Sequence, residues 1–503
     1  MKTDEKLDLG ILILISFLLS TYLFFQTYVI AMDGAFQHIP MAKMFATGSF
    51  REAINYSGQQ PLYAILVSLV YRWAGDFELA ARWVSSFFGI IIVFPVYFLA
   101  SRISDRRVAF LTTLFLVIHP YVRRYSADAL KESTYLFFFA TAVWFALRAV
   151  QREQIRLFLF VPFFSGLAYL ARPDGIEPLL AVFFYTIFVE RFSVSGKKPR
   201  VIFLLFLSSG LLLLPYLLHL REVTGAWTLS KTKGMAAFLG LGMMKEGIPF
   251  VDKVLFALKD LNLEIIATVH PLYTFFLVIG FATKIRTGFK RGEGLLVVLW
   301  VLHYVVVFLL ILNLTDWSAN SAERVLFFSG RHALSLLLVS ICWIGEGFWT
   351  SYQWVLMKAE SSSWGRHWDS QRQAVIGWGV LLAITLAIIL PKTLKPQRYE
   401  RLSEKRIGFW IESQSGKGNT VFTTMPRVAY YADGVLEYFD FDKESLDQVH
   451  AAMVNKKAYY LVIREEEVKH LNKVAEPIRK SLVEAMRYEK KGMERIIVYR
   501  RTP

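Results

Sequence analysis

The 503-residue sequence contains a single cysteine, Cys342, which lies inside an apolar run. One cysteine excludes an intrachain disulfide, and the histidines form no cluster with the spacing of a metal site. The glycines of "GKGNT" at 416–420 lack the spacing of a phosphate-cradling loop and are interpreted as a turn into a strand. The sequence therefore gives no sign of a disulfide framework, a structural metal or a P-loop nucleotide site.

Charged residues are also scarce, at 19%, whereas 55% of the residues are hydrophobic, 16% are aromatic and the mean hydropathy is +0.40. Such a chain cannot fold as one soluble domain without a large apolar surface in water. Apolar stretches long enough to cross a hydrocarbon core of roughly 30 Å recur from Leu7 to about Leu390. We therefore predict a mainly α-helical, multi-pass protein of the cell membrane, with a membrane domain at 1–392 and a soluble domain at 393–503.

The net charge of +16 is explained by membrane topology and not by a nucleic-acid partner, because Lys and Arg near span ends favour the cytoplasm. Basic clusters occur around Arg102, Arg148, Arg191, Lys284 and Arg366. With these clusters and the N-terminus inside, the chain makes about eleven crossings and its C-terminus lies outside. The predicted spans are about 7–30, 79–101, 108–120, 132–149, 157–171, 175–191, 201–220, 268–283, 294–313, 331–349 and 374–391.

Two features shape the predicted outer face. The apolar run at 61–74 is too short to cross and is expected to be a helix lying at the outer interface. The larger outer loops are then 31–78 and 221–267. The tail at 393–503 alternates short β-branched or aromatic runs, such as "NTVFTT" and "ERIIVYRR", with helical periods. This pattern predicts a small α/β domain on the extracytoplasmic side.

Asp33 follows the first span, just before Gly34. One interpretation is a helix terminus or an N-cap for the next helix, a common role for an aspartate at a helix start. The other is a general base at the water–lipid boundary, which takes a proton from an incoming hydroxyl or amine while it faces a lipid-borne substrate. The stretches "TGSF" and "GQQPLY" further along indicate a first outer loop that stays close to the membrane surface.

The second outer segment, "RRYSADALKEST", carries charges of both signs at the head of a span. Asp128 and Glu132 are four residues apart and are expected on one helical face, with Lys131 beside them and Arg124 upstream. One interpretation is a self-neutralising, solvated helix end. The other is a pocket wall in which cations meet a phosphate and an acid orients an acceptor or a metal. Both interpretations stay open at this point, and so does the choice between Asp128 and Glu132.

Arg172 in "ARPDG" and Arg331 with His332 in "GRHAL" lie at predicted outer span ends. Either arginine alone is explained by a side chain that reaches the lipid headgroups. Together they suggest neutralisation of a phosphate, because guanidinium groups bind phosphate oxygens through paired hydrogen bonds. His303 lies within an apolar run and is interpreted as a packing residue.

The order of these motifs resembles the GT-C class of integral membrane glycosyltransferases, particularly the protein mannosyltransferase and aminoarabinose transferase branch. The resemblance covers Asp33, "TGSF", "QPLY", "ELAARWVSSFFG", "GLAYLARPDG" and, more loosely, "FFSGRHALSLLLVS". It implies an outer-face transfer of a sugar from a polyprenyl-phosphate carrier, with Asp33 as the base, an acid near 132 and an arginine at 172 and at 331. The chain departs from this pattern in having Gly34 where an acid is usual, and "QQP" at 59–61 where the aminoarabinose branch has "KPP".

The resemblance and the charges together predict transfer of one hexosyl or pentosyl unit by direct, inverting displacement. Asp33 accepts the proton of the acceptor, which is a glycan, lipid or protein, while Glu132 or Asp128 supplies a second acid. The departing phosphate is stabilised by basic residues, namely Arg172, Arg331, Lys131, Arg124 and His332. Dependence on a divalent metal stays open. The alternatives are a lipid-linked glycan polymerase or ligase and, less favoured, a transporter or flippase, whose charges would lie near the midplane.

Overall fold

The computed structural model describes residues 3–189, 197–231, 248–315, 317, 329–361, 370–441, 444–473 and 476–502. Residues 232–247 of the predicted outer loop, and Arg191 and Arg366 of the predicted basic clusters, lie outside this part. The chain forms two compact units. The membrane unit comprises Met1–Tyr22 and Met41–Leu394, and the C-terminal unit comprises Leu23–Pro40 and Lys395–Pro503.

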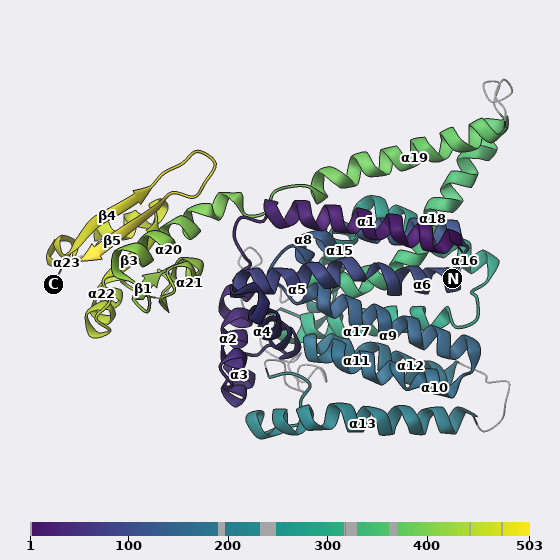
Figure 1. Ribbon diagram of the computed structural model, residues 1–503, viewed down its shortest axis with the longest axis horizontal. Helices are drawn as coiled ribbons and strands as arrows, with labels where there is room; N and C mark the ends of the chain where they lie inside the picture. The colour runs from purple at the N-terminus through teal and green to yellow at the C-terminus, as the bar shows by residue number, and fades with distance from the viewer. Residues whose placement is uncertain are drawn as a thin grey trace. The chain divides into compact units, whose positions relative to one another are not determined.

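Seven helical stretches in the described part of the chain are long and apolar enough to cross a membrane, which confirms a multi-span helical protein (Figure 1). They are α1 (Thr3–Gln26), α5 with α6 (Phe77–Ile91 and Val93–Ile103), α9 (Glu132–Arg152), α13 (Lys197–Thr224), α17 (Gly294–Leu314), α18 (Leu334–Ser361) and α19 (Ser370–Thr393). The helices α15 (Phe250–Val269) and α16 (Pro271–Thr287) make an eighth stretch that bends by 100°. The bend falls at His270, where φ is 82° and the next residue is a proline.

The predicted span at 157–171 is present as an apolar helical stretch, Ile155–Ala171, made of α10 (Ile155–Phe158) and α11 (Phe160–Ala171). Two other predicted spans are shorter in the structure than the sequence suggests, namely α7 (Arg106–Val117) and α12 (Glu177–Phe188), each of 12 residues. Such a helix is about 18 Å long, which is less than the roughly 30 Å of a hydrocarbon core. By length and composition, the helices that the structure describes give seven or eight crossings, whereas the sequence predicts about eleven. The helix α4 (Leu62–Ala74) has 13 residues, in agreement with the short helix predicted there.

Glycines allow two long helices of the membrane unit to touch. A Cβ added at Gly280 of α16 would lie 1.8 Å from the carbonyl oxygen of Trp343, and one at Gly347 of α18 would lie 1.8 Å from that of Phe276. No side chain fits at either position, so the two backbones approach directly, as in other small-residue contacts between membrane helices. In Figure 1, α9, α11, α12 and α17 lie beside one another in the same unit.

Arg123 is part of this helix packing and not of a pocket wall. It lies in α8 (Pro120–Ser126) and is fully buried. Its guanidinium donates hydrogen bonds to Ser16 Oγ (2.8 Å), Ser20 Oγ (3.0 Å) and the carbonyl oxygen of Gly89 (2.6 Å). These bonds join α8 to α1 and α5, so the buried charge serves to fix helices.

The C-terminal unit contains a five-stranded sheet in the order β2-β1-β3-β5-β4, which confirms the predicted α/β domain. Strands β1 (Thr420–Thr423), β2 (Val435–Tyr438) and β3 (Tyr460–Arg464) are parallel, while β5 (Ile496–Arg501) pairs antiparallel with β3 and with β4 (Leu482–Tyr488). The helices are α20 (Leu402–Ser415), α21 (Pro426–Tyr431), α22 (Leu446–Asn455) and α23 (Glu476–Ser481). The "GKGNT" stretch turns into β1, with φ of 73° at Gly416 and 80° at Gly418, as predicted.

Alternate residues of the strands pack into two hydrophobic cores, one on each face of this sheet. Val421 and Val462 pack with Ile407 and Val428, which come from α20 and α21. Their neighbours along the strands, including Phe422, pack instead with residues of α22. This period of two explains why the strands are apolar on both faces and need helices on each side.

Candidate active site

Arg172 stands where α11 ends and is only 5% exposed. Its Nε forms an ion pair with Asp174 Oδ2 at 2.9 Å, and its Nη1 donates a hydrogen bond to the backbone carbonyl oxygen of Arg331 at 2.7 Å. The guanidinium also lies over the ring of Tyr135, 5.4 Å from its centroid. The side chain is therefore buried and oriented by three groups, and the alternative in which Arg172 merely reaches the headgroups is wrong.

The turn that carries Asp174 depends on a glycine. This turn, η2 (Pro173–Ile176), folds back on the end of α11. A Cβ at Gly175 would lie 2.1 Å from the backbone carbon of Ala168, so only glycine fits here. The "ARPDG" motif thus encodes the tight turn that brings Asp174 to Arg172.

Arg331 lies in η3 (Gly330–His332), just before α18, and its side chain is partly exposed. His332 closes the same turn, because its Nδ1 accepts a hydrogen bond from the backbone amide of Ser329 at 3.3 Å. The structure thus brings Arg172 and Arg331 together across 159 residues of chain. The ring of His332 helps to hold the η3 turn, which carries Arg331.

A buried pair that the sequence reasoning missed supports this turn. His303 Nδ1 of α17 lies 2.6 Å from Glu177 Oε2 of α12, and His303 Nε2 lies 2.8 Å from the backbone carbonyl oxygen of His332. Both side chains are buried, so the interpretation of His303 as an apolar packing residue is wrong. An ionisable residue in an apolar span is itself a signal that a polar partner exists, and this signal was available in the sequence.

Replacing Glu177 by leucine is expected to destabilise the membrane unit. The change leaves a buried imidazole nitrogen without its partner, which costs about 1–3 kcal/mol. Thermal unfolding of the detergent-solubilised protein measures this as a lowered Tm. Glu222→Leu is the matched control, because Glu222 forms an exposed ion pair with Arg51. Equal Tm values for the two variants would contradict a supporting role for Glu177.

Asp128 and Glu132 do not share a helical face, which corrects the prediction. α8 ends at Ser126 and α9 begins at Glu132, so Asp128 lies in the turn between them. Asp128 Oδ1 accepts a hydrogen bond from the amide of Ala129 at 2.8 Å, and its backbone oxygen accepts one from Leu130. A short acidic side chain that binds nearby amides favours a turn over a continued helix.

Glu132 is a buried acid at the start of α9. It is 1% exposed, and its Oε2 has no hydrogen-bond partner within the part of the chain that the structure describes. Its charge acts electrostatically on Arg172 and on Tyr125. A buried carboxylate oxygen without a protein partner is unusual and marks a position where a ligand group can bind.

Two further cations complete the arrangement. The charges of Arg124 and Arg331 both act on Tyr125, and the largely buried Lys131 donates a hydrogen bond to Gln59 Oε1. Gln59 belongs to the "QQP" loop, where the resemblance leads one to expect a lysine. The loop has no lysine at that position, but Lys131 from another segment contacts it. We refer to Arg124, Lys131, Arg172 and Arg331 as the basic cluster.

Asp33 belongs to the C-terminal unit and is half-buried. It has helical dihedrals, with φ of −60° and ψ of −34°, and precedes η1 (Gly34–His38), a short π-helix. Asp33 thus lies at the terminus of this helix, as one interpretation predicted, but its side chain makes no capping hydrogen bond to it. π-Helical turns are rare and occur frequently at functional sites.

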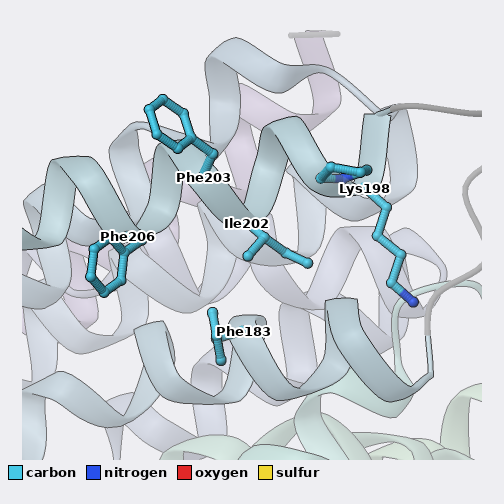
Figure 2. Close-up of a pocket in the computed structure, with 6 residues that line it drawn as sticks. Phe183, Lys198, Ile202, Phe203 and Phe206 are labelled. Atoms are coloured by element: carbon cyan, nitrogen blue, oxygen red, sulfur yellow. The ribbon is translucent and has the colours of Figure 1, made fainter.

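The cavity in Figure 2 lies between α12 and α13 and is separate from the basic cluster. It has a volume of about 570 Å³ and is lined by aromatic and aliphatic side chains with one lysine, namely Phe183, Lys198, Pro199, Ile202, Phe203 and Phe206. Lys198 Nζ donates a hydrogen bond to the carbonyl oxygen of Ile187. This lining suits a hydrocarbon chain better than a polar reactant. Within the described ranges no three His, Cys, Asp or Glu side chains come together as a metal site.

Comparison with known proteins agrees with this picture. Residues 58–219 match the dolichyl-phosphate-mannose-protein mannosyltransferase family. The archaeal oligosaccharyltransferase AglB from Archaeoglobus fulgidus, in complex with an inhibitory peptide and a dolichol-phosphate, is 13% identical with a TM-score of 0.59 over 100% of this chain and 74% of its own. ArnT from Cupriavidus metallidurans, bound to undecaprenyl phosphate, is 12% identical with a TM-score of 0.57 over 98% and 97%. No curated protein matches the sequence.

The solved structures and the family match cover different lengths of the chain. At these identities the two solved structures show the fold, which is that of the GT-C enzymes. Residues 58–219, less than half of the chain, match the dolichyl-phosphate-mannose-protein mannosyltransferase family, and the fold over nearly the whole chain is that of the two solved enzymes. This confirms the resemblance found in the sequence.

Proposed function

We propose that the chain transfers a single sugar from a polyprenyl-phosphate carrier to an acceptor on the outer face of the membrane, by direct and inverting displacement. The observation that carries this proposal is the buried, oriented Arg172 joined to Arg331. A phosphate leaving group develops negative charge as its bond to the sugar breaks, and fixed guanidinium groups stabilise that charge. Lys131 and Arg124 add positive charge to the same cluster, and His332 holds the turn of Arg331.

In this mechanism Asp33 is the general base. The acceptor hydroxyl or amine gives its proton to the Asp33 carboxylate, and its lone pair forms the bond to the anomeric carbon. The bond from that carbon to the phosphate oxygen breaks, and its electrons stay on the phosphate. One displacement inverts the anomeric centre. The π-helical turn that begins directly after Asp33 supports this role, because such turns occur frequently at functional sites.

Glu132 is proposed as the second acid in preference to Asp128. Both acids have a buried carboxylate oxygen, but Asp128 binds the backbone of its own turn through Oδ1, whereas the charge of Glu132 acts on Arg172 and Tyr125. A carboxylate in this position orients an acceptor group or ligates a divalent cation. The acceptor is a glycan, lipid or protein.

We also propose that the C-terminal unit lies on the extracytoplasmic side, because the alternation of basic loops favours this topology. Ser415→Cys tests it. Ser415 is exposed at the end of α20, and the native Cys342 is buried and expected to stay unlabelled in the parent chain. An impermeant maleimide should label Ser415→Cys in intact cells. Labelling only after permeabilisation would place the unit inside and overturn the topology.

A second candidate function is polymerisation or ligation of lipid-linked glycans, since the fold is shared with an oligosaccharyltransferase. The two functions differ in the donor that is consumed. To distinguish the two functions, lipid extracts of cells that carry the active chain are compared by mass spectrometry with extracts of cells that carry Asp33→Asn. We expect a polyprenyl-phosphate monosaccharide to accumulate with the inactive variant, whereas accumulation of a diphosphate-linked oligosaccharide would favour the second function. A transporter is disfavoured, because the basic cluster lies at helix ends and in turns.

A further inference from the structure

The segment that carries Asp33 packs with the C-terminal domain. Leu23–Pro40 and Lys395–Pro503 form one compact unit, although more than 350 residues of chain separate them. We propose that this domain positions the catalytic base, with Gln397 and Tyr431 as the positioning residues. The inference rests on the proposed role of Asp33 and assigns to the domain a part in the reaction.

Gln397 binds the chain at the point where α1 ends. Its amide donates to the carbonyl oxygen of Gln26 at 2.8 Å, and its own carbonyl oxygen accepts from the amide of Tyr28 at 3.2 Å. This is a parallel bridge between Thr27 and Gln397. The side-chain Nε2 also donates to Thr27 Oγ1 at 3.1 Å, and Gln397 is only 2% exposed. One residue thus fixes three consecutive residues through backbone and side chain.

The next residues continue this attachment toward Asp33. Arg398 Nη1 donates to the carbonyl oxygen of Val29 at 3.0 Å, and the rings of Tyr28 and Tyr399 pack edge to face with centroids 5.2 Å apart. The amide of Ile30 donates to the hydroxyl oxygen of Tyr431 at 3.1 Å. Ile30 is fully buried and lies three residues before Asp33. The Tyr431 hydroxyl therefore satisfies a buried amide just before the π-helix, where an unmade hydrogen bond is costly.

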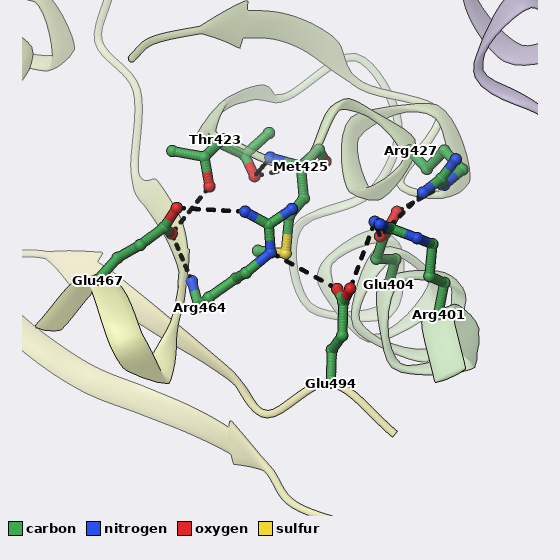
Figure 3. A network of polar contacts seen from close by, with 9 residues as sticks. Arg401, Glu404, Thr423, Met425, Arg427, Arg464, Glu467 and Glu494 are labelled. Atoms are coloured by element: carbon green, nitrogen blue, oxygen red, sulfur yellow. Dashed lines mark hydrogen bonds and ion pairs between the residues drawn. The ribbon is translucent and has the colours of Figure 1, made fainter. Parts of the chain in front are cut away.

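The helix that carries Tyr431 is held by several contacts within the same unit. α21 is fixed to α20 by a buried ion pair in which Glu404 accepts from Arg427 Nε at 2.7 Å and Nη2 at 3.1 Å. Figure 3 shows this pair continuing through Arg401 and Glu494. A Cβ at Gly408 of α20 would lie 2.4 Å from Tyr431 Cβ, so glycine allows the close contact.

Such rigidity matters to a general base. Proton transfer needs the base within hydrogen-bond reach of the acceptor, and a misplacement of about 1 Å can cost on the order of 10²-fold in rate. A domain that anchors the chain three residues before Asp33 controls this distance. Tyr431 and Gln397 act through Asp33 and touch neither reacting group, so they are positioning residues.

The test is a mutant cycle on the full-length protein in vesicles. Tyr431→Phe keeps the ring and removes only the hydroxyl, and Gln397→Ala removes the side-chain bond to Thr27. Each should lower kcat about 10-fold with the donor KM unchanged. Tyr431→Phe should cause no further loss in the Asp33→Asn background, because a mispositioned base matters only where a base exists. Ser445→Ala is the control, since Ser445 caps α22 in the same unit and should leave kcat unchanged.

Two results would overturn the inference. One is a kcat within two-fold of wild type for both Tyr431→Phe and Gln397→Ala while Asp33→Asn is inactive. The other is an equal proportional loss from Tyr431→Phe in the wild-type and the Asp33→Asn backgrounds, which indicates a general structural effect. Failure of the proposed function gives a different result, namely an active Asp33→Asn. Gln397→Ala decides the matter if Tyr431→Phe does not fold, as judged by size-exclusion chromatography.

Discussion

Asp33→Asn is expected to lower turnover by roughly 10²–10⁴-fold while the protein still binds the lipid-linked donor. Asparagine is nearly isosteric with aspartate and keeps the shape of the site, but its amide cannot accept the acceptor proton. The side chain of Asp33 makes no capping bond to η1, so loss of a cap cannot explain a fall in activity. The initial rate of polyprenyl phosphate release measures turnover, and a separate assay measures binding of the donor.

Asp76→Asn is the matched control for this substitution. Asp76 caps α5 and accepts a hydrogen bond from the amide of Leu79 at 2.7 Å, a role that asparagine can also fill. Its activity should stay at the wild-type level. If Asp33→Asn also retained turnover within a few-fold of wild type, Asp33 would not be the base, and the search would move to Glu132 and Asp128.

Arg172→Lys and Arg331→Lys are each expected to lower turnover on the order of 10²-fold, as for loss of one preorganised donor to a developing anion. Lysine keeps the charge but lacks the planar fork. Arg172 uses this fork to hold Asp174 through Nε and the carbonyl oxygen of Arg331 through Nη1. A lysine cannot keep both contacts and also present a donor to phosphate. The rates are measured at saturating donor, with insertion checked by size-exclusion chromatography.

Arg487→Lys controls for the loss of a guanidinium as such. Arg487 is exposed and pairs with Glu484 and Glu465 at the surface of the C-terminal unit. Its replacement should leave turnover unchanged, because exposed ion pairs contribute little. Wild-type rates in both Arg172→Lys and Arg331→Lys would remove the phosphate-binding role from the basic cluster.

Composition and length predicted the architecture well, because hydrophobic burial dominates it. The short α4 and the alternation of the tail follow directly from the lengths and periods of apolar runs. The structure describes seven or eight stretches long enough to cross, whereas the sequence predicts about eleven, because apolar runs alone do not reveal where helices end. α7, for example, stops before His119 and Pro120, and the chain then starts a new helix. A proline restricts the residue before it, but hydropathy alone does not register this.

Pattern and resemblance selected Arg172 and Arg331 as candidates, which the structure brings together, but they could not assign roles to neighbouring charges. Arg123 and Arg124 are adjacent in the sequence, yet Arg123 is buried against Ser16 and Ser20 while Arg124 is partly exposed. Which of two adjacent arginines enters the helix packing depends on α1, far away in the chain. The packing of residues 23–40 with Tyr431 depends on a contact across 401 residues, for which the sequence holds no local signal.

The most direct test of the account uses the purified protein in vesicles with a polyprenyl-phosphate monosaccharide and an acceptor extract. Mass spectrometry then follows both the lipid and the sugar. The account predicts release of free polyprenyl phosphate together with a product that has gained one sugar, and neither product with Asp33→Asn. Consumption of a diphosphate-linked oligosaccharide in place of the monophosphate donor, or equal product with Asp33→Asn, would contradict it.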